Sequence, residues 1–224
     1  MINIALDGLS GSGKGALADG LAKKLNLIHL DTGAIFRGIA CGFLDLGFTD
    51  PTNEEIENNI NSINVSVKIE DGKQLVYLNS ENITPNLRKE EVSKLSSKVS
   101  IHSVVREKYL QIVNTFANNY DCIIDGRDIT SIVLPNADCK IYLTADENVR
   151  AKRRYDENVA KNIPCTYKEV LENLKERDYR DTHRDIAPLI IVPDAFIVDN
   201  SNLSIDETID ICYKYIASKL GLEV

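Results

Sequence analysis

The chain of 224 residues suits a single domain, or a single domain with an insert. Its hydrophobic content of 43% is ample for a buried core. No stretch approaches the run of about eighteen apolar residues that a membrane span needs. The formal net charge of −8 argues against non-specific binding to nucleic acid or to an anionic membrane surface.

The cysteines and the N-terminus favour a cytoplasmic protein. The five cysteines show no C-x-x-C pair, and most fall in apolar elements, where they are expected to be small core residues. The first residues lack the basic segment of a signal peptide and run directly into a strand pattern. Both observations fit a reducing compartment.

The first predicted strand covers residues 2–6, and a glycine-rich loop and a helix pattern over 16–25 follow it. The loop reads Gly8-Leu9-Ser10-Gly11-Ser12-Gly13-Lys14, and Gly15 and Ala16 come next. Between a strand and a helix, this pattern predicts a phosphate-binding P-loop. Glycines let successive backbone N–H groups face one anion, the helix N-terminus adds partial positive charge, and Lys14 adds a full charge. A chance glycine-rich turn is the alternative, which the flanking elements disfavour.

A second strand over residues 27–30 leads into Asp31-Thr32-Gly33-Ala34-Ile35-Phe36-Arg37, which opens a helix. Arg37 then lies near the edge of the sheet where ligands bind. After a polar, acidic stretch, residues 63–84 show alternating apolar residues around Asp71-Gly72. This pattern predicts an antiparallel hairpin inserted into an α/β core. Residues 88–119 return to a helical pattern.

The next strand, 122–125, runs into Asp125-Gly126-Arg127-Asp128. An acidic residue at the end of a strand beside a P-loop is the usual place for magnesium or its water ligands. A helix cap or a turn residue is the alternative for Asp125. Arg127 and Asp128 are then expected on the loop over the site.

After a strand over 140–145, arginines gather in two helical segments. Spacing puts Arg150, Arg153 and Arg154 on one helical face, and it does the same for Arg177, Asp181 and Arg184. Guanidinium groups bind phosphate oxygens two at a time, so both clusters are candidate anion sites. A salt-bridged helix surface is the alternative, and the scarcity of acid beside the first cluster disfavours it.

The last elements are a strand over 195–198 and a helix over 204–220 that opens with the capping box Ser204…Glu207. Short strands that alternate with helices predict a parallel sheet covered on both faces. We therefore expect an α/β P-loop three-layer fold with a five-stranded parallel sheet, a small antiparallel β insert and a short helical lid.

Four segments carry a resemblance to a known family. They are Leu6–Gly15, Asp31–Arg37, Asp125–Asp128 and Lys175–Arg184, and Ala187-Pro188-Leu189 follows the last. In this order they resemble the bacterial cytidylate kinases, which belong to the nucleoside monophosphate kinases among P-loop proteins. The resemblance covers nearly the full chain, and its last three segments are more specific than the P-loop.

This resemblance implies transfer of the γ-phosphate of ATP to CMP or dCMP, with Mg²⁺, giving the diphosphate in pyrimidine nucleotide metabolism. It implies one kinase domain over residues 1–224, with a core of 1–58 and 85–224. A nucleotide-binding insert over 59–84, extending into the following helix, and a lid over 150–165 would complete it. We expect a monomer that binds neither nucleic acid nor a membrane.

The resemblance also implies roles for the matching residues. ATP would contact Gly8, Leu9, Ser10, Gly11, Ser12, Gly13, Lys14, Gly15 and Ala16, and Arg153 and Arg154 would hold its phosphates from the lid. The acceptor would contact Ser10, Thr32, Arg37, Arg127 and Arg184 near its phosphate, Ser97, Arg106 and Asp128 at the cytosine, and Arg177 and Asp181 at the sugar. The expected catalytic set is Lys14, Arg37, Asp125, Arg127 and Arg184. No residue is expected to bind metal directly, and Asp125 would act through water.

Two departures from the family pattern stand out. Ala16 takes the place of a usual threonine, which removes one hydrogen bond to a donor phosphate. Phe36 takes the place of a frequent tyrosine, whereas Thr32 for serine keeps the hydroxyl. Two other functions remain open at this point: a kinase for another monophosphate such as UMP, and a nucleotide-binding regulator with impaired catalysis.

Overall fold

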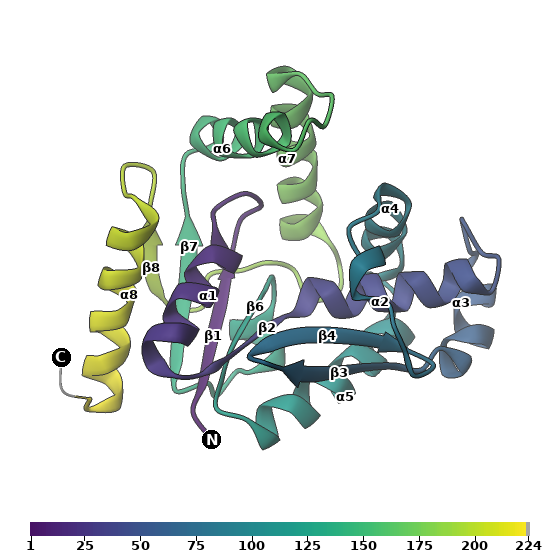
Figure 1. The fold of residues 1–224 in the computed structure, drawn as a ribbon, viewed down its shortest axis with the longest axis horizontal. Coiled ribbons are helices and arrows are strands. Elements are labelled where there is room, and N and C mark those ends of the chain that lie inside the picture. The colour runs from purple at the N-terminus through teal and green to yellow at the C-terminus, as the bar shows by residue number, and fades with distance from the viewer. Residues whose placement is uncertain (223–224) are drawn as a thin grey trace. The chain divides into compact units, whose positions relative to one another are not determined.

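The computed structural model describes residues 1–222, and the chain divides into two compact units. We call Ile2–Ile28 with Asp121–Val224 the P-loop unit, and Met1 with His29–Tyr120 the hairpin unit. The path of the chain through each unit is shown in Figure 1.

The P-loop unit is built on a parallel sheet. Its strands are β1 (Asn3–Gly8), β6 (Cys122–Gly126), β7 (Cys139–Thr144) and β8 (Phe196–Asp199), and β2 (Ile28–Asp31) begins in this unit. The strand order is β2-β6-β1-β7-β8. β1 pairs in parallel with β6 and β7, and β7 pairs in parallel with β8. The predicted five-stranded parallel sheet is confirmed.

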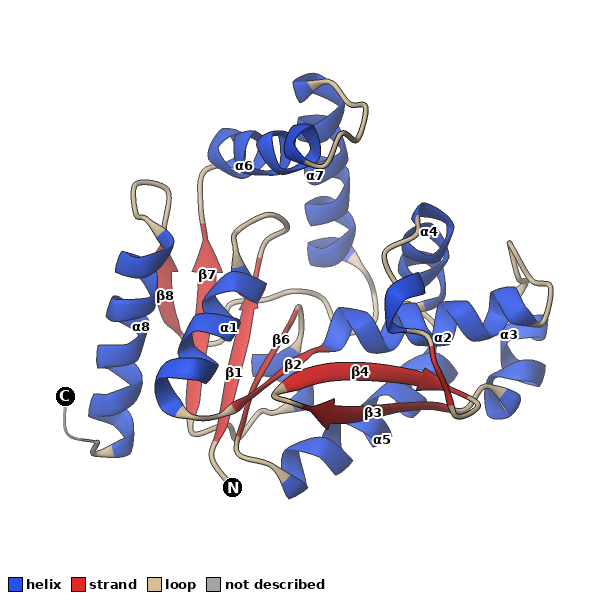
Figure 2. Ribbon diagram, in the orientation of Figure 1, coloured by secondary structure: helices blue, strands red, loops and turns tan. Residues whose placement is uncertain are grey.

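Four helices surround the strands of this unit. They are α1 (Lys14–Leu25), α6 (Glu147–Ala160), α7 (Tyr167–His183) and α8 (Ile205–Leu220). Fully buried Leu17 and Leu21 of α1 and Ile216 of α8 belong to one apolar cluster with Ile4 and Leu6 of β1. α6 and α7 cross each other beyond the carboxyl ends of β1 and β7 (Figure 2). The helices of this unit thus both cover the sheet and reach over the end where the P-loop lies.

A short π-helix follows β6 at Ile129–Val133, which the sequence patterns did not indicate. Its start is fixed by Asp7 of β1, whose carboxylate accepts hydrogen bonds from the Ile129 N–H at 3.0 Å and the Thr130 N–H at 2.7 Å. The Thr130 hydroxyl adds a third at 2.7 Å. A buried acid on the central strand therefore sets the backbone that follows Arg127 and Asp128.

The hairpin unit consists of helices and a small antiparallel sheet. The helices are α2 (Thr32–Asp45), α3 (Asn53–Asn59), α4 (Glu90–Val99) and α5 (Ser103–Asn119), with 3-10 turns at Ile60–Ser62 and Thr84–Asn86. The strands are β3 (Val65–Glu70), β4 (Lys73–Leu78) and β5 (Glu81–Asn82), in the order β3-β4-β5. Asp71 and Gly72 both have positive φ, 51° and 71°, as the tight primed hairpin turn requires. The predicted hairpin is confirmed.

Helix α3 lies in the stretch that sequence analysis described only as polar and acidic. Thr52 and Glu55 form a reciprocal capping box at its N-terminus. Only Ile56 is buried among its residues, so the helix has almost no apolar periodicity to reveal it.

The cysteines are free, and four of the five are buried. Burial raises the pKa of Cys122 and Cys212 to about 12 and that of Cys139 to about 11. These thiols therefore stay protonated at neutral pH and act as core residues, as expected.

Two glycines let α2 approach the hairpin closely. A Cβ at Gly42 would lie 2.3 Å from the Cγ2 of Ile63, and one at Gly38 would lie 2.9 Å from the Cγ1 of Val76. Both distances are shorter than any ordinary carbon–carbon contact. The packing of α2 on the sheet therefore depends on these two missing side chains.

We predict that Gly42→Ala lowers the free energy of unfolding by about 1–3 kcal/mol through overpacking. Alanine favours a helix over glycine by up to ~1 kcal/mol, so helix propensity alone would make the variant more stable. A loss of stability would therefore report the steric clash. Gly15→Ala is the matched control, since a Cβ added there would meet nothing within 4 Å. Urea unfolding followed by circular dichroism measures both, and equal stability of the two variants would contradict the packing account.

Candidate nucleotide site

The P-loop joins β1 to α1 through three glycines with positive φ. Gly8, Gly11 and Gly13 have φ values of 153°, 72° and 94°. A Cβ at Gly8 would lie 2.0 Å from the carbonyl oxygen of Leu143, so no other residue fits there. Gly13 is the N-cap of α1, whose first N–H groups have no intrahelical acceptor. The loop therefore has the backbone form of an anion-binding nest.

The carbonyl groups of this loop are bound by side chains. The Lys14 ammonium donates to the carbonyls of Gly8 at 2.8 Å and Leu9 at 2.9 Å. Arg150 donates to the carbonyl of Ser10 at 2.8 Å, and the Asn200 amide donates to that of Ser12 at 3.0 Å. The Ser10 N–H is also bound, by Asp178 at 2.8 Å, so the amides that can face a ligand are others of the loop and of the start of α1.

Lys14 is the central charge of the site. It is 6% exposed, and burial keeps its pKa well below the usual range for lysine. The positive charges of Arg127 and Arg177 lower the pKa further, whereas the Asp125 carboxylate opposes them. A polyphosphate bound at the loop would stabilise the ammonium form.

A second group of charged side chains surrounds Ser10. Arg127 donates from Nη2 to the Ser10 hydroxyl at 3.0 Å and from Nε to Asp181 at 2.8 Å. Arg177 lies 3.9 Å from the same Asp181 oxygen. The two segments that sequence analysis assigned to the acceptor, after β6 and on α7, are thus brought together beside the P-loop.

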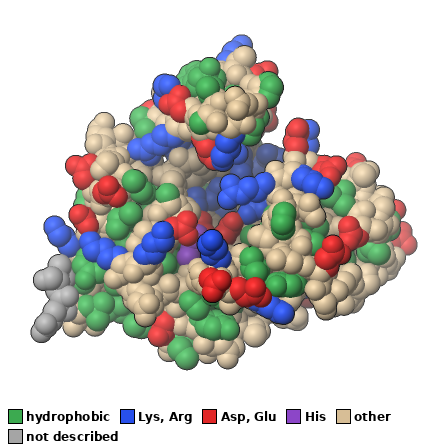
Figure 3. Space-filling model, in the orientation of Figure 1, with side chains coloured by type: hydrophobic (Ala, Val, Ile, Leu, Met, Phe, Trp, Pro, Cys, Tyr) green, Lys and Arg blue, Asp and Glu red, His purple; other side chains and the backbone are tan. Residues whose placement is uncertain are grey.

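Arg184 and Asp128 form a further pair in this unit. The Arg184 Nη2 lies 3.7 Å from Asp128, and its Nε donates to the carbonyl of Ala187 at 2.6 Å. Asp128 is 3% exposed, so its charge is held away from water. In the space-filling view, Lys and Arg side chains gather below α6 and beside α7 (Figure 3).

Asp125 lies near the end of β6, opposite Leu6 of β1, and is 8% exposed. No group of three or more His, Cys, Asp or Glu residues within the described chain could hold a metal ion. One carboxylate beside a phosphate-binding loop does fit Mg²⁺, which keeps several waters and takes oxygen ligands from substrate phosphates.

The three arginines of α6, which their spacing places on one helical face, have different environments. Arg150 is buried, with an exposed fraction of 5%. Arg153 donates to the Asn200 side chain at 3.0 Å and to its carbonyl at 2.8 Å. Arg154 is exposed and pairs with Glu157 at 3.0 Å. Arg153 is held by Asn200 and Arg154 lies on the surface, whereas Arg150 is part of the framework.

In the hairpin unit, Asp31 caps α2 by accepting from the Ala34 N–H, and it pairs with Arg37 at 2.7 Å. The Nε of Arg37 is buried and has no hydrogen-bond partner among the residues described. Thr32, next to the cap, is 3% exposed. A buried donor without an acceptor is costly, and a bound oxyanion would satisfy it.

Arg106 is buried against aromatic rings. Its guanidinium lies 5.9 Å from the Phe36 ring and 5.8 Å from the Tyr109 ring, and the two rings stack at 4.3 Å. Its Nη1 donates to the Ser100 carbonyl at 3.3 Å. Ser97 is exposed on α4. The aromatic pair thus orients an arginine that sequence analysis assigned to the base.

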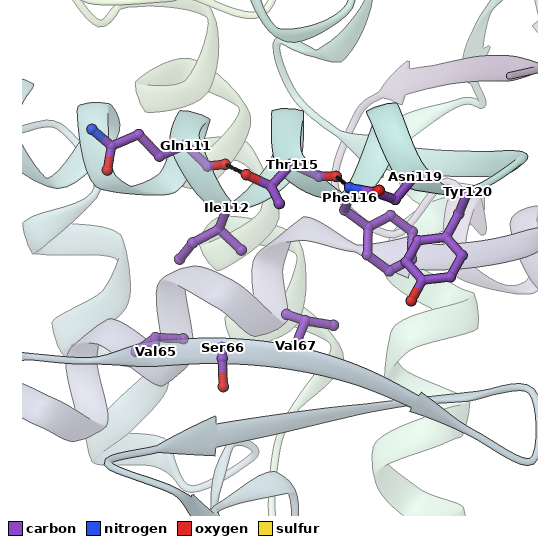
Figure 4. Close-up of a pocket in the computed structure, with 9 residues that line it drawn as sticks. All are labelled: Val65, Ser66, Val67, Gln111, Ile112, Thr115, Phe116, Asn119 and Tyr120. Carbon is purple, nitrogen blue, oxygen red and sulfur yellow. Dashed lines mark hydrogen bonds between the residues drawn. The ribbon is translucent and has the colours of Figure 1, made fainter.

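The hairpin unit also contains a cavity of about 570 Å³ between β3 and α5 (Figure 4). Val65 and Val67 point toward α5, and Ile112 and Phe116 point back toward the strand. The nine residues that line it carry no charge. This cavity is therefore unsuited to phosphate.

No helix in the described part of the chain is both long and apolar enough to cross a membrane.

The class of the protein follows from three features of the site. They are a glycine-rich phosphate loop at the end of the central strand, a buried lysine and a second set of arginines. Together they define a P-loop kinase.

Comparisons with known proteins identify the family. The family model for cytidylate kinase matches residues 4–218. A cytidylate kinase of Caldicellulosiruptor saccharolyticus is 40% identical, over 100% of this chain and 99% of its own. A cytidylate kinase of Caldicellulosiruptor bescii is 38% identical, over 98% of this chain and 99% of its own. The chain belongs to the cytidylate kinase family.

A solved structure supports the fold independently. An uncharacterized protein from Eubacterium ventriosum has a TM-score of 0.55, covers 97% of this chain and 99% of its own, and is 14% identical. At that identity the likeness concerns the fold alone.

We predict that ATP binding takes up a proton through Lys14. Its pKa is lowered in the free protein and is raised by bound phosphate, so affinity falls as pH rises through the free-protein pKa. Calorimetry over a series of pH values, in buffers of different ionisation enthalpy, measures the uptake. Lys14→Arg, which keeps the charge but does not titrate, is the control, and equal proton uptake by both proteins would refute the prediction.

Proposed function

We propose that this protein transfers the γ-phosphate of ATP to CMP and dCMP, giving CDP and dCDP for pyrimidine nucleotide metabolism. Family membership supports this, and one observation carries it: Arg127 contacts both the P-loop residue Ser10 and Asp181 of α7. A second anion-binding group on the P-loop itself is what phosphoryl transfer between two nucleotides requires.

The donor phosphates are assigned to the P-loop. Residues Gly8 to Ala16 would contact these phosphates through the Lys14 charge and through backbone N–H groups other than that of Ser10, which binds Asp178. Arg153 and Arg154 of α6 would close on the outer phosphates. The lid would have to move for this, because Arg153 is held by Asn200 in the free protein. Mg²⁺ would be held by phosphates, by waters and, through water, by Asp125, and it would supply positive charge against the transferred group.

Each unit is assigned its own residues that bind the acceptor nucleotide. In the P-loop unit, Ser10, Arg127 and Arg184 hold the phosphate, and Arg177 and Asp181 hold the sugar. In the hairpin unit, Thr32 and Arg37 serve the phosphate, and the buried Nε of Arg37 supports this. Lys14, Arg37, Asp125, Arg127 and Arg184 are the proposed catalytic set, since each places charge where phosphoryl transfer develops it.

The cytosine is assigned to Ser97, Arg106 and Asp128. A buried carboxylate at Asp128 suits the exocyclic amino group, which uracil lacks. We further propose that the protein acts as a cytoplasmic monomer, and its free cysteines fit that compartment.

We predict that kcat/KM for CMP and dCMP exceeds that for UMP by about a thousandfold or more, because UMP would place a carbonyl oxygen, not an amino donor, against the buried Asp128 carboxylate. A coupled assay of ADP release with each common monophosphate measures this. Lys14→Ala sets the background and is expected to lose turnover. Equal rates with UMP would overturn the assignment of the cytosine readers, and no turnover with any monophosphate would favour a regulator.

Restoring the hydroxyl at residue 16 is predicted to have a modest effect. Ala16 is exposed at the start of α1, so Ala16→Thr fits sterically and can donate to a donor phosphate. The KM for ATP is expected to fall severalfold, by about 1 kcal/mol of binding energy. Steady-state kinetics at saturating CMP measures it, and a complete loss of activity would mean that the site requires alanine.

A further inference from the structure

Ser10 is held by a separate side chain at each of its polar groups. Its N–H donates to Asp178 at 2.8 Å, its carbonyl accepts from Arg150 at 2.8 Å, and its hydroxyl accepts from Arg127 at 3.0 Å. Ser10 is 2% exposed, so water competes little for these bonds. The peptide on each side of this P-loop residue therefore has a fixed orientation.

Two of those partners are also paired with each other. Arg150 of α6 donates from Nη1 to Asp178 of α7, and the two side chains are only 6% and 14% exposed. The Nε of Arg150 donates to the carbonyl of Ala145 at 2.9 Å, just before α6. The guanidinium thus bridges the start of α6, the aspartate of α7 and the P-loop.

Joining α6 to α7 does not need this ion pair. Ala151 of α6 packs with Val170 and Leu174 of α7 in an apolar cluster of their own. A buried ion pair is weak evidence for stability, because desolvation offsets the attraction. The pair instead orients the peptide groups of Ser10, because Asp178 binds the Ser10 N–H and Arg150 binds the Ser10 carbonyl.

We propose that Arg150 and Asp178 form a positioning pair that fixes the Ser10 peptide for phosphoryl transfer. This inference rests on the proposed function. The pair would keep the groups that bind the donor aligned with the groups that bind the acceptor. Arg150 binds the Ser10 carbonyl, so the Gly11 N–H of the same trans peptide points the opposite way, toward the donor phosphates. The Ser10 hydroxyl is the attachment point of Arg127. Misplacement by about 1 Å can cost about a hundredfold in rate.

The test compares two aspartates that each pair with a cation of α6. Asp178→Ala removes the acceptor of the Ser10 N–H, whereas Asp156→Ala removes an exposed ion pair with Lys152. We expect Asp178→Ala to lower kcat about ten- to a hundredfold while the KM of either nucleotide changes less than about threefold. Asp156→Ala should stay within about twofold of the unsubstituted protein in both.

A structural readout accompanies the kinetics. Hydrogen exchange of the Ser10 amide, followed by NMR, should quicken in Asp178→Ala and not in Asp156→Ala, since only the former loses its acceptor. Asp178→Asn keeps an acceptor oxygen without the charge, so its exchange rate and kcat should lie between those of Asp178→Ala and the unsubstituted protein. All assays are run where circular dichroism shows the variants folded.

The outcomes separate this inference from the proposed function. A kcat of Asp178→Ala within about twofold of the unsubstituted protein, or a change in KM alone, would overturn the positioning role. Unchanged exchange at Ser10 would overturn it as well. If the unsubstituted protein phosphorylates no monophosphate, the proposed function fails, and calorimetric ATP affinity and Ser10 exchange still decide the role of the pair.

Discussion

The direction of the peptide groups in the P-loop is the constraint on which the rest of the site depends. A phosphate is bound only if the amides face it, and then the carbonyls must face the protein. Every one of those carbonyls needs a buried donor. Lys14, Arg150 and Asn200 supply donors for four of them, and they come from α1, α6 and the end of β8. The folding of distant segments is therefore a condition for the loop to bind anions.

Acidic residues give the arginines their positions before any ligand arrives. Arg37, Arg127, Arg150 and Arg184 each lie beside an aspartate, namely Asp31, Asp181, Asp178 and Asp128. Without such partners, cations that lie close together within the P-loop unit, such as Arg127 and Arg150 at Ser10, would repel one another. A chain with a net charge of −8 can thus hold a strongly basic site, because its acids are distributed as counterions within it. The negative net charge of the chain is therefore compatible with a basic site.

Most of the fold could be predicted because its signals are local. The strands are short apolar runs, the Asp71-Gly72 turn has its own chemistry, and the last helix begins at a capping box. Helix α3 was missed because one buried residue gives no periodicity. The π-helix was missed because it depends on Asp7, 122 residues away from Ile129.

The site was harder to predict for the same reason. Arg150, Arg153 and Arg154 share a face by spacing, yet burial separates their roles, and burial is a property of the packed chain. Asp178 lies within a segment that the family resemblance had marked, but nothing local indicated that it binds the Ser10 amide. Residues that contact a ligand leave a motif in the sequence, whereas residues that hold the motif in place are identified only by their contacts.

The free protein keeps some polar groups unsatisfied, and these groups indicate where binding energy is directed. The Arg37 Nε is buried without an acceptor among the described residues, and the first amides of α1 have none within the helix. The buried Arg37 donor costs about 1–3 kcal/mol while it is unpaired, whereas exposed amides at the start of α1 can bond water. An oxyanion bound at Arg37 would remove that cost, and a phosphate bound at the P-loop would raise the lowered pKa of Lys14. The Ser10 N–H, carbonyl and hydroxyl are already bonded in the free protein, so binding would not have to order them.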